Sequence, residues 1–315
     1  MNIPIVFCFD DRILLGAGVS ILSLIEAADD QTVYDIHILH ADLAPSSTDA
    51  LESLVRDTRH KMSFHRVSAD RFADAPKNRG SWTEVVYFRL LISEILGEYD
   101  RAIYSDVDVF FKCDMGGLFQ SDLQGAEWGG VVAERNSPDF VMHKHFPENE
   151  KEFIYFSGFM LMDLALMRRN AAVGRYFDAI RMFGDRLSFF DLDLLNIATP
   201  QIASLPFKYV TLEDIYESDD ISQARDFKFL KSVYSVDQLE HERENPAIIH
   251  YAGPRGKPWQ RRDVPDYYLR AVKKLPPALR KTTFRDFRKR LLGKTGRAHL
   301  VSRTPHQRLS PFSRF

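Results

Sequence analysis

Short apolar runs alternate along the chain with longer segments in which apolar residues recur at helical spacing. The short runs predict buried strands at 3–9, 33–39, 61–67, 102–105, 128–133, 153–163 and 247–250. The longer segments predict helices at 14–28, 46–55, 81–96, 170–183, 264–275 and 278–292. This alternation predicts an α/β fold that opens with the βα unit of a nucleotide-binding sheet. No Gly-x-Gly-x-x-Gly follows the first strand, which argues against a dinucleotide site.

Asp106 and Asp108 are the most informative polar positions, because they follow the apolar run 102–105 directly. Residues two apart on an extended chain share one face, and buried carboxylates need a cation or a hydrogen-bond cage. The pair is therefore expected to hold Mn²⁺ or Mg²⁺ through oxygen ligands. A cation at the carboxyl end of a strand is well placed to bind a nucleotide diphosphate. The alternative is a turn in which both aspartates cap the local backbone.

Further polar residues interrupt apolar segments. Asp10 and Asp11 end the first strand. Arg89 lies inside an apolar helix and needs an anion, which is either a core acid or a diphosphate. Ser157 and Gly158 break the strand 153–163, as glycine does where a ligand or backbone approaches closely.

Asp191 and Asp193 lie among apolar residues in the segment 189–196. At helical spacing they do not share a face, so they are expected to do different jobs. One is expected to cap the helix and the other to face a cleft, unless both only add negative charge at the helix N-terminus.

The segment 247–259 combines a short strand that ends on His250 with a loop rich in glycine and proline. Glycines let backbone N–H groups approach phosphate oxygens, and a lysine such as Lys257 supplies a point charge. His250 is a candidate third metal ligand. The alternative is a basic turn.

Composition adds a charge asymmetry to this picture. Residues 271–315 contain 13 Lys and Arg against the single acid Asp286, whereas the whole chain has a net charge of −2. A basic tail on an acidic body predicts a negatively charged surface as partner. The two cysteines, Cys8 and Cys113, make no disulfide framework and favour a reducing compartment. Neither a secretory signal nor an apolar run long enough for a membrane span is evident.

Together these stretches resemble glycosyltransferase family 8, which includes bacterial lipopolysaccharide galactosyl- and glucosyltransferases. The resemblance runs from about residue 3 to residue 259. It rests on six ordered segments, which are Phe9-Asp10-Asp11, Tyr87-Phe88-Arg89-Leu90, Tyr104-Ser105-Asp106-Val107-Asp108, Phe156-Ser157-Gly158, Asp191-Leu192-Asp193-Leu194-Leu195-Asn196, and His250-Tyr251-Ala252-Gly253 with Lys257-Pro258-Trp259.

The resemblance implies a GT-A fold with a single Rossmann-like mixed sheet, and a retaining, metal-dependent hexosyltransferase. It implies metal ligands at Asp106, Asp108 and His250 for Mn²⁺ or Mg²⁺, and catalytic roles at Asp191 and Asp193. The donor-binding positions that it implies are Asp10, Asp11, Arg89, Asp106, Ser157, Gly253 and Lys257.

Four departures from the family pattern concern the sugar more than the diphosphate. Arg12 and Ser157 each replace a usual Asn, Leu192 replaces a usual Gln, and one extra residue separates Gly253 from Lys257.

The sequence therefore predicts transfer of galactose or glucose from a UDP-sugar to a saccharide or glycolipid acceptor, as in the synthesis of lipopolysaccharide or another cell-surface glycan. Two alternatives are a sugar-nucleotide-binding protein with impaired turnover and a metal-dependent nucleotidyltransferase. The expected domains are a catalytic domain at 1–262 and a basic helical tail at 263–315, with a disordered end. The tail is expected to dock on an anionic membrane, not on nucleic acid, and to place the enzyme on the cytoplasmic face of the inner membrane.

Overall fold

The computed structural model describes residues 1–76, 83–253 and 255–280 of the 315-residue chain. Its strands form a main sheet of eight strands in the order β3-β2-β1-β4-β8-β6-β7, with β9 paired to β6, and a second sheet in the order β10-β11-β5. The strands are β1 Asn2–Cys8, β2 Val33–His40, β3 Lys61–Arg66, β4 Arg101–Ser105, β5 Val109–Phe111, β6 Trp128–Arg135, β7 Phe153–Tyr155, β8 Phe159–Asp163, β9 Ile202–Leu205, β10 Thr211–Leu212 and β11 Ile248–His250.

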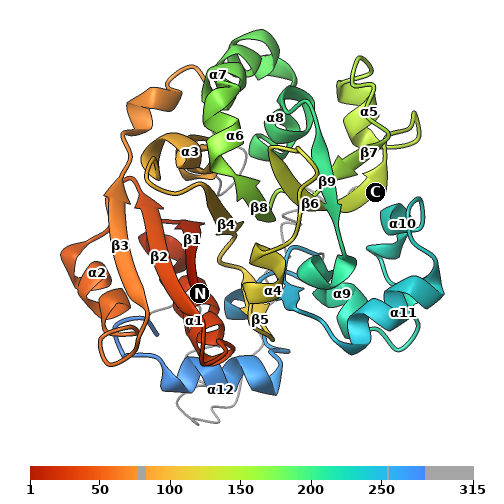
Figure 1. The fold of residues 1–315 in the computed structure, drawn as a ribbon. Helices are drawn as coiled ribbons and strands as arrows, with labels where there is room; N and C mark the ends of the chain where they lie inside the picture. The colour runs from red at the N-terminus through yellow and green to blue at the C-terminus, as the bar shows by residue number, and fades with distance from the viewer. Residues whose placement is uncertain (77–82, 254, 281–315) are drawn as a thin grey trace, which may run out of the picture.

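The main sheet is mixed and lies between helices on both faces (Figure 1). β1 pairs in parallel with β2 and β4, whereas β8 runs antiparallel to β4 and β6. The helices are α1 Leu14–Glu26, α2 Pro45–Glu52, α3 Ile92–Ile95, α4 Gly116–Phe119, α5 Val141–His145, α6 Leu164–Arg169, α7 Ala172–Phe183, α8 Asp191–Ala198, α9 Glu213–Tyr216, α10 Phe227–Leu230, α11 Val236–Glu244 and α12 Asp266–Lys274.

The side chains of β1 show why this strand lies at the centre. Ile3, Ile5 and Phe7 join the hydrophobic cluster that contains α1, α2 and α12. Val6 and Cys8 join the cluster on the other face, which contains α3, α6, α7 and α8. Successive strand residues point to opposite faces, so an uninterrupted apolar run fits a strand covered on both sides.

Several predicted helices have different bounds in the structure, and two of them are instructive. The segment 81–96 forms a 3-10 helix, Glu84–Leu91, followed by α3, and the predicted cap residue Ser81 lies outside the described residues. The second helix begins at Pro45 instead of Ser46, because proline suits the first helical turn, where its missing N–H leaves no partner unsatisfied.

The second sheet was not predicted from the sequence. The chain leaves the main sheet at the end of β4, bends through 106–108, and enters the small sheet as β5. There β5 lies antiparallel to β11, which brings residues 248–250 beside residues 109–111. The predicted interruption of the strand 153–163 is confirmed, since β7 and β8 flank it.

The helix α12 packs on α1 at the bottom of the molecule as drawn in Figure 1. A Cβ added at Gly18 of α1 would lie 3.1 Å from Leu275 and 3.3 Å from Leu279, and both leucines are fully buried. The first part of the predicted tail therefore belongs to the core. Residues 281–315, which include most of the predicted helix 278–292, lie outside the described residues.

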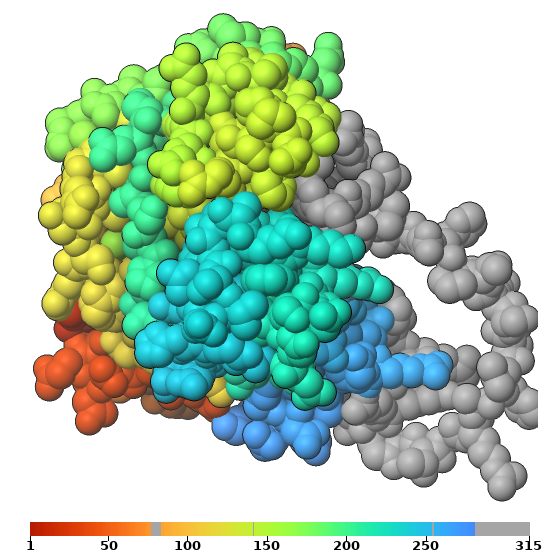
Figure 2. All heavy atoms as spheres, turned by 90° about the vertical axis from the view of Figure 1, so that its right-hand side faces the viewer, coloured from red at the N-terminus to blue at the C-terminus, as the bar shows by residue number. Residues whose placement is uncertain are grey.

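On the face seen in Figure 2, the segment that carries α9, α10 and α11 lies beneath the segment that carries α5 and β7. Within the described part of the chain, no helix is both long and apolar enough to span a membrane.

Candidate active site

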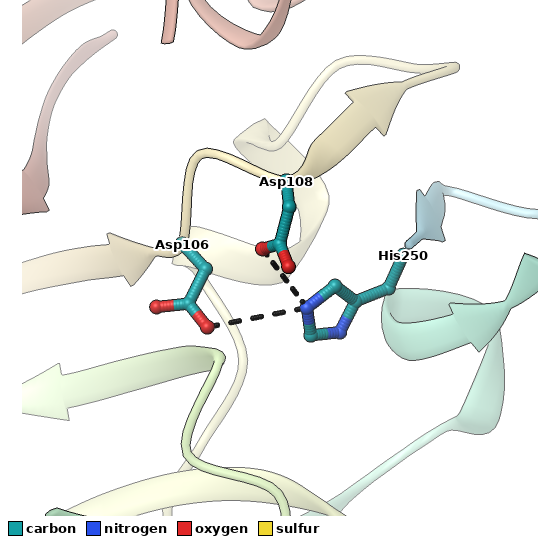
Figure 3. Close-up of side chains that lie close together, drawn as sticks. All are labelled: Asp106, Asp108 and His250. Carbon is teal, nitrogen blue, oxygen red and sulfur yellow. Dashed lines mark ion pairs between the residues drawn. The ribbon is translucent and has the colours of Figure 1, made fainter. Parts of the chain in front are cut away.

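Asp106, Asp108 and His250, called the triad below, converge at the junction of the two sheets (Figure 3). His250 Nε2 lies 3.3 Å from Asp108 Oδ1 and 3.9 Å from Asp106 Oδ2. One ligand atom from each residue falls within 4.8 Å of the others. Among the described residues, this is the only group of three or more acids, histidines or cysteines with such a spacing. The structure thus brings His250 next to two aspartates that lie 142 and 144 positions before it in sequence.

Backbone pairing holds the triad in place. His250 ends β11 opposite Val109, and the N–H of Tyr251 donates to the carbonyl of Asp108 at 2.9 Å. The N–H of Asp106 donates to the carbonyl of Gly158 at 2.7 Å. A Cβ added at Gly158 would lie 2.6 Å from His250 Cε1 and 2.8 Å from Asp106 Oδ2, so a side chain there would intrude on the triad.

The donor atoms of the triad fit a divalent cation. Both ring nitrogens of His250 are buried and have no hydrogen-bond partner among the described residues. A buried imidazole with an unsatisfied nitrogen that faces two carboxylates is expected to ligate a metal. Two carboxylates and one imidazole form a donor set that suits Mn²⁺ as well as other first-row divalent ions.

Lys257 pairs with the triad in this structure. Its Nζ contacts Asp108 Oδ2 and donates to the carbonyl of Tyr251 at 3.0 Å. Burial alone would raise the pKa of Asp108, but Lys257 and His250 more than offset it and hold that pKa well below its usual range. Asp108 is therefore ionised and already engages one positive charge.

Arg89 connects the triad to Asp191. The guanidinium lies 2.9 Å from Asp106 Oδ1 and 3.0 Å from Asp191 Oδ2, and it donates to the carbonyl of Ser157 at 2.9 Å. Its Cζ stands 4.4 Å from the centre of the Tyr104 ring. Burial would lower the pKa of Arg89, but Asp106 and Asp191 raise it above its ordinary value, so the cation persists. The sequence left a core acid and a diphosphate as alternative partners of Arg89, and in the structure its partners are the acids Asp106 and Asp191.

Asp191 begins α8 and is 4% exposed. Its Oδ2 accepts a hydrogen bond from Ser157 Oγ at 2.9 Å in addition to the contact with Arg89. Burial raises its pKa to about 6, although Arg89 opposes that shift. The preceding Phe190 has a φ of 51°, a left-handed conformation that is strained for a bulky residue. The strained residue directly precedes Asp191, at the point where the chain turns into α8.

Asp193 has different partners from Asp191, as their spacing predicts. Its Oδ2 accepts hydrogen bonds from the backbone N–H groups of Ser188 at 2.5 Å and Phe189 at 2.7 Å. It therefore ties down the turn that precedes α8. These hydrogen bonds lie in the turn before α8 and not at the N-cap of the helix itself.

Asp10 and Asp11 lie at the same edge of the sheet, since they follow β1, the neighbour of β4. Asp10 accepts hydrogen bonds from the backbone and guanidinium of Arg12, with an ion-pair distance of 2.6 Å. Arg12 also donates to Thr83 Oγ1 at 3.2 Å, and Asp11 Oδ2 accepts from the N–H of Ala44 at 3.1 Å. The substitution of Arg12 for the family's Asn thus occupies Asp10 with an ion pair.

Two contacts of the site were missed from the sequence. Tyr104 donates its phenolic hydrogen to Asp106 Oδ1 at 2.6 Å, and its place two residues before Asp106 was the available signal. Asp226 packs against Gly253, and a Cβ added there would lie 2.6 Å from Asp226 Oδ2. An acid beside the apolar segment 227–230 was its only signal.

Comparison with known proteins shows which family this chain matches. The model of the family described as Glycosyl transferase family 8 matches residues 4–263. General stress protein A of Bacillus subtilis (strain 168) is 22% identical over 264 residues, which cover 81% of this chain and 86% of that protein. Lipopolysaccharide 1,2-glucosyltransferase of Escherichia coli (strain K12) is 24% identical over 255 residues, which cover 80% and 71%.

Solved structures show the same fold. The galactosyltransferase LgtC, in a complex with donor and acceptor sugar analogs, superposes with a TM-score of 0.72 at 23% identity, covering 88% of this chain and 99% of LgtC. The bifunctional glycosyltransferase WbbM gives a TM-score of 0.71 at 21% identity, covering 92% of this chain and 52% of WbbM. The predicted GT-A fold is confirmed.

Proposed function

Because the chain belongs to glycosyl transferase family 8, we propose that it transfers galactose or glucose from a UDP-sugar to a saccharide acceptor, with retention of anomeric configuration. The observation that carries the proposal is the triad, which lies directly beside the Arg89–Asp191 pair. The triad is suited to bind a diphosphate with its cation, and the Arg89–Asp191 pair is suited to bind the hydroxyl groups of a sugar.

Asp106, Asp108 and His250 are the proposed ligands of Mn²⁺ or Mg²⁺, which would neutralise the leaving diphosphate as a Lewis acid. Lys257 and the backbone of Gly253 are proposed to bind diphosphate oxygens. Lys257 now contacts Asp108, so a second positive charge at that carboxylate would weaken the contact and free the ammonium for the diphosphate.

Asp191 is proposed to position the sugar hydroxyls. Retention in glycosidases uses a carboxylate nucleophile beside a second carboxyl group. Here both Arg89 and the Ser157 hydroxyl contact Asp191 Oδ2, which lowers its nucleophilicity and fixes its orientation. This supports attack by the acceptor on the face that the diphosphate leaves, with the diphosphate assisting deprotonation. Asp193 supports the turn before α8, and Asp10 and Asp11 are proposed to line the nucleoside side.

The acceptor is proposed to be a lipopolysaccharide or another cell-surface glycan. The Escherichia coli relative named for lipopolysaccharide glucosylation supports this class. The basic residues of 281–315 support docking on an anionic membrane, on its cytoplasmic face, where a lipid-linked acceptor would be reached.

The function is tested by donor hydrolysis and transfer with UDP-glucose and UDP-galactose, with mass spectrometry of the product. Activity should vanish in EDTA and return with Mn²⁺. Full turnover in the chelator would contradict the metal site. Donor binding without either reaction would instead favour the binding-protein alternative, which Ser157 and Leu192 motivate.

Membrane docking is tested by co-sedimentation with vesicles of anionic or neutral lipid. The truncation should end after Arg280, not after Leu275, because Leu279 is buried in the core. Full-length protein should pellet with anionic vesicles only and dissociate at high salt. The truncated protein should stay in the supernatant and still hydrolyse donor, whereas equal pelleting of both proteins would exclude the tail as the anchor.

A further inference from the structure

A buried carboxyl group lies directly behind Gly253, in the segment that connects His250 to Lys257. Asp226 precedes α10 and is 1% exposed. A Cβ added at Gly253 would lie 2.6 Å from Asp226 Oδ2 and 3.8 Å from Asp214 Cβ. Only the hydrogen of glycine fits at this position, so Gly253 packs directly against the carboxyl group of Asp226.

The carboxyl group of Asp226 is not neutralised by its neighbours. Its Oδ2 has no hydrogen-bond partner among the described residues. The charged group that α9 turns toward it is another acid, Asp214, whose Oδ2 accepts the N–H of Asp226 at 3.2 Å. Burial raises the pKa of Asp226 to about 7, with a smaller contribution from Asp214 in the same direction, although Arg225 on its own segment opposes both. Asp226 is thus a group whose charge depends on its surroundings near neutral pH.

A nearby acid shows that the fold can supply a cation where a buried carboxylate needs one. Glu213, beside Asp214 on α9, is 2% exposed and forms two contacts with the guanidinium of Arg261. No ion pair to Asp226 occurs among the described residues. An unpaired buried carboxylate is unfavourable, so the neutral form is the one that this packing accommodates.

We propose that Asp226 is a positioning residue of the donor site, which supports Gly253 as a neutral carboxyl group and opposes the donor diphosphate as a carboxylate. The inference rests on the proposed binding of a nucleoside diphosphate at Gly253 and Lys257. A diphosphate brought to this loop adds negative charge beside the carboxyl group and favours its protonation. Donor binding above neutral pH therefore takes up a proton from solvent onto Asp226.

Calorimetric titration of UDP with Mn²⁺ tests the proposal on the full chain, in buffers of different ionisation enthalpy at pH 7.5. The proteins are the wild type, Asp226→Asn, and Asp219→Asn as a control with an exposed acid between α9 and α10. The wild type and the control should take up more protons than Asp226→Asn. From pH 6.5 to pH 8.5, the affinity of the wild type should fall about tenfold more than that of Asp226→Asn.

Equal proton uptake and equal pH dependence in the wild type and Asp226→Asn would overturn the proposal. Absence of UDP binding in every protein would instead contradict the proposed function, so the two failures are distinguishable. If Asp226→Asn does not fold, as judged by circular dichroism, Asp226→Ser replaces it in the same titrations.

A second experiment tests the contact without any titration. Gly253→Ala should weaken UDP binding about tenfold or more, because the added methyl group collides with the carboxyl group of Asp226. The double variant Gly253→Ala, Asp226→Ala should recover part of that loss, because it removes the obstructing carboxyl group. The same affinity in the single and double variants would show that Asp226 does not position the loop.

Discussion

Asp191 and Asp226 are both buried aspartates beside the proposed donor site, yet their surroundings differ. Asp191 contacts the Arg89 guanidinium and accepts a hydrogen bond from Ser157. Asp226 has Asp214 as its charged neighbour on α9 and an unsatisfied oxygen. Burial raises both pKa values, to about 6 for Asp191 and about 7 for Asp226. A partnered acid keeps its charge and orients what it touches, whereas an unpartnered acid changes its charge when an anion approaches.

Replacing Arg89, the buried cation that contacts Asp191, should have the largest effect on stability. Arg89→Ala leaves the carboxylates of Asp106 and Asp191 without the buried cation that both contact. Breaking a buried pair in this way is expected to lower the free energy of unfolding by about 3–5 kcal/mol. Urea denaturation measures it. The matched control is Arg71→Ala, which breaks the exposed pair with Glu94 and should change stability by less than about 1 kcal/mol.

Asp108→Asn tests a carboxylate that contacts Lys257 in this structure and is proposed to bind the metal ion instead. The variant removes one charged ligand of the proposed metal and one ion-pair partner of Lys257. Turnover should fall by about 10²–10³, as when a group that stabilises transition-state charge is lost. The rate of donor hydrolysis at saturating Mn²⁺ measures it. The control is Asp42→Asn, at an exposed acid, which should have the turnover of the wild type. Wild-type turnover in Asp108→Asn as well would contradict the proposed role of Asp108 as a metal ligand.

Asp191→Asn separates orientation of the sugar from binding of the diphosphate. Turnover should fall about 10²-fold, because a misplaced sugar loses its reactive geometry. The affinity for UDP, measured by calorimetry, should change little, since the described contacts of Asp191 are with Arg89 and Ser157. A parallel loss of UDP affinity and turnover would instead assign Asp191 to the diphosphate or to the fold.

Asp226→Asn tests the raised pKa of Asp226 through the pH dependence of stability. The pKa of Asp226 is about 7 in the folded chain, whereas an unperturbed aspartate titrates near 3.9. Between these values the folded state binds more protons, so the stability of the wild type falls as pH rises from about 4 to 7. Asparagine does not titrate, so the stability of the variant relative to the wild type should rise by about 2 kcal/mol between pH 5 and pH 8. Denaturation at both pH values measures it, and an unchanged difference would contradict the raised pKa.

The strands of the main sheet other than β9, and the convergence of Asp106, Asp108 and His250, could be predicted from the sequence. The apolar runs are local signals, and the motif order of the family supplies the long-range pairing. The partner of Arg89 could not be predicted. An arginine in an apolar helix needs an anion, but the sequence does not show whether that anion is a core acid or a diphosphate.

Contacts that depend on tertiary packing could not be predicted. The hydrogen bond between Ser157 and Asp191 joins residues 34 positions apart, and the contact of Asp226 with Gly253 depends on how α10 packs beside the loop. The small sheet was missed for the same reason, since the short strand β5 gains its identity only from its pairing with β11.

The position of the triad at the junction of two sheets has a consequence for biosynthesis. Two of its members lie on the connection from β4 to β5, and the third ends β11, the central strand of the small sheet. A nascent chain that has not yet emerged beyond residue 250 therefore lacks both that strand and the complete constellation. Such a chain contains the strands of the main sheet but not the complete triad, which is the proposed site of donor activation. If the proposed function holds, activity requires the last part of the domain, and incompletely synthesised or C-terminally degraded molecules would not consume nucleotide sugar.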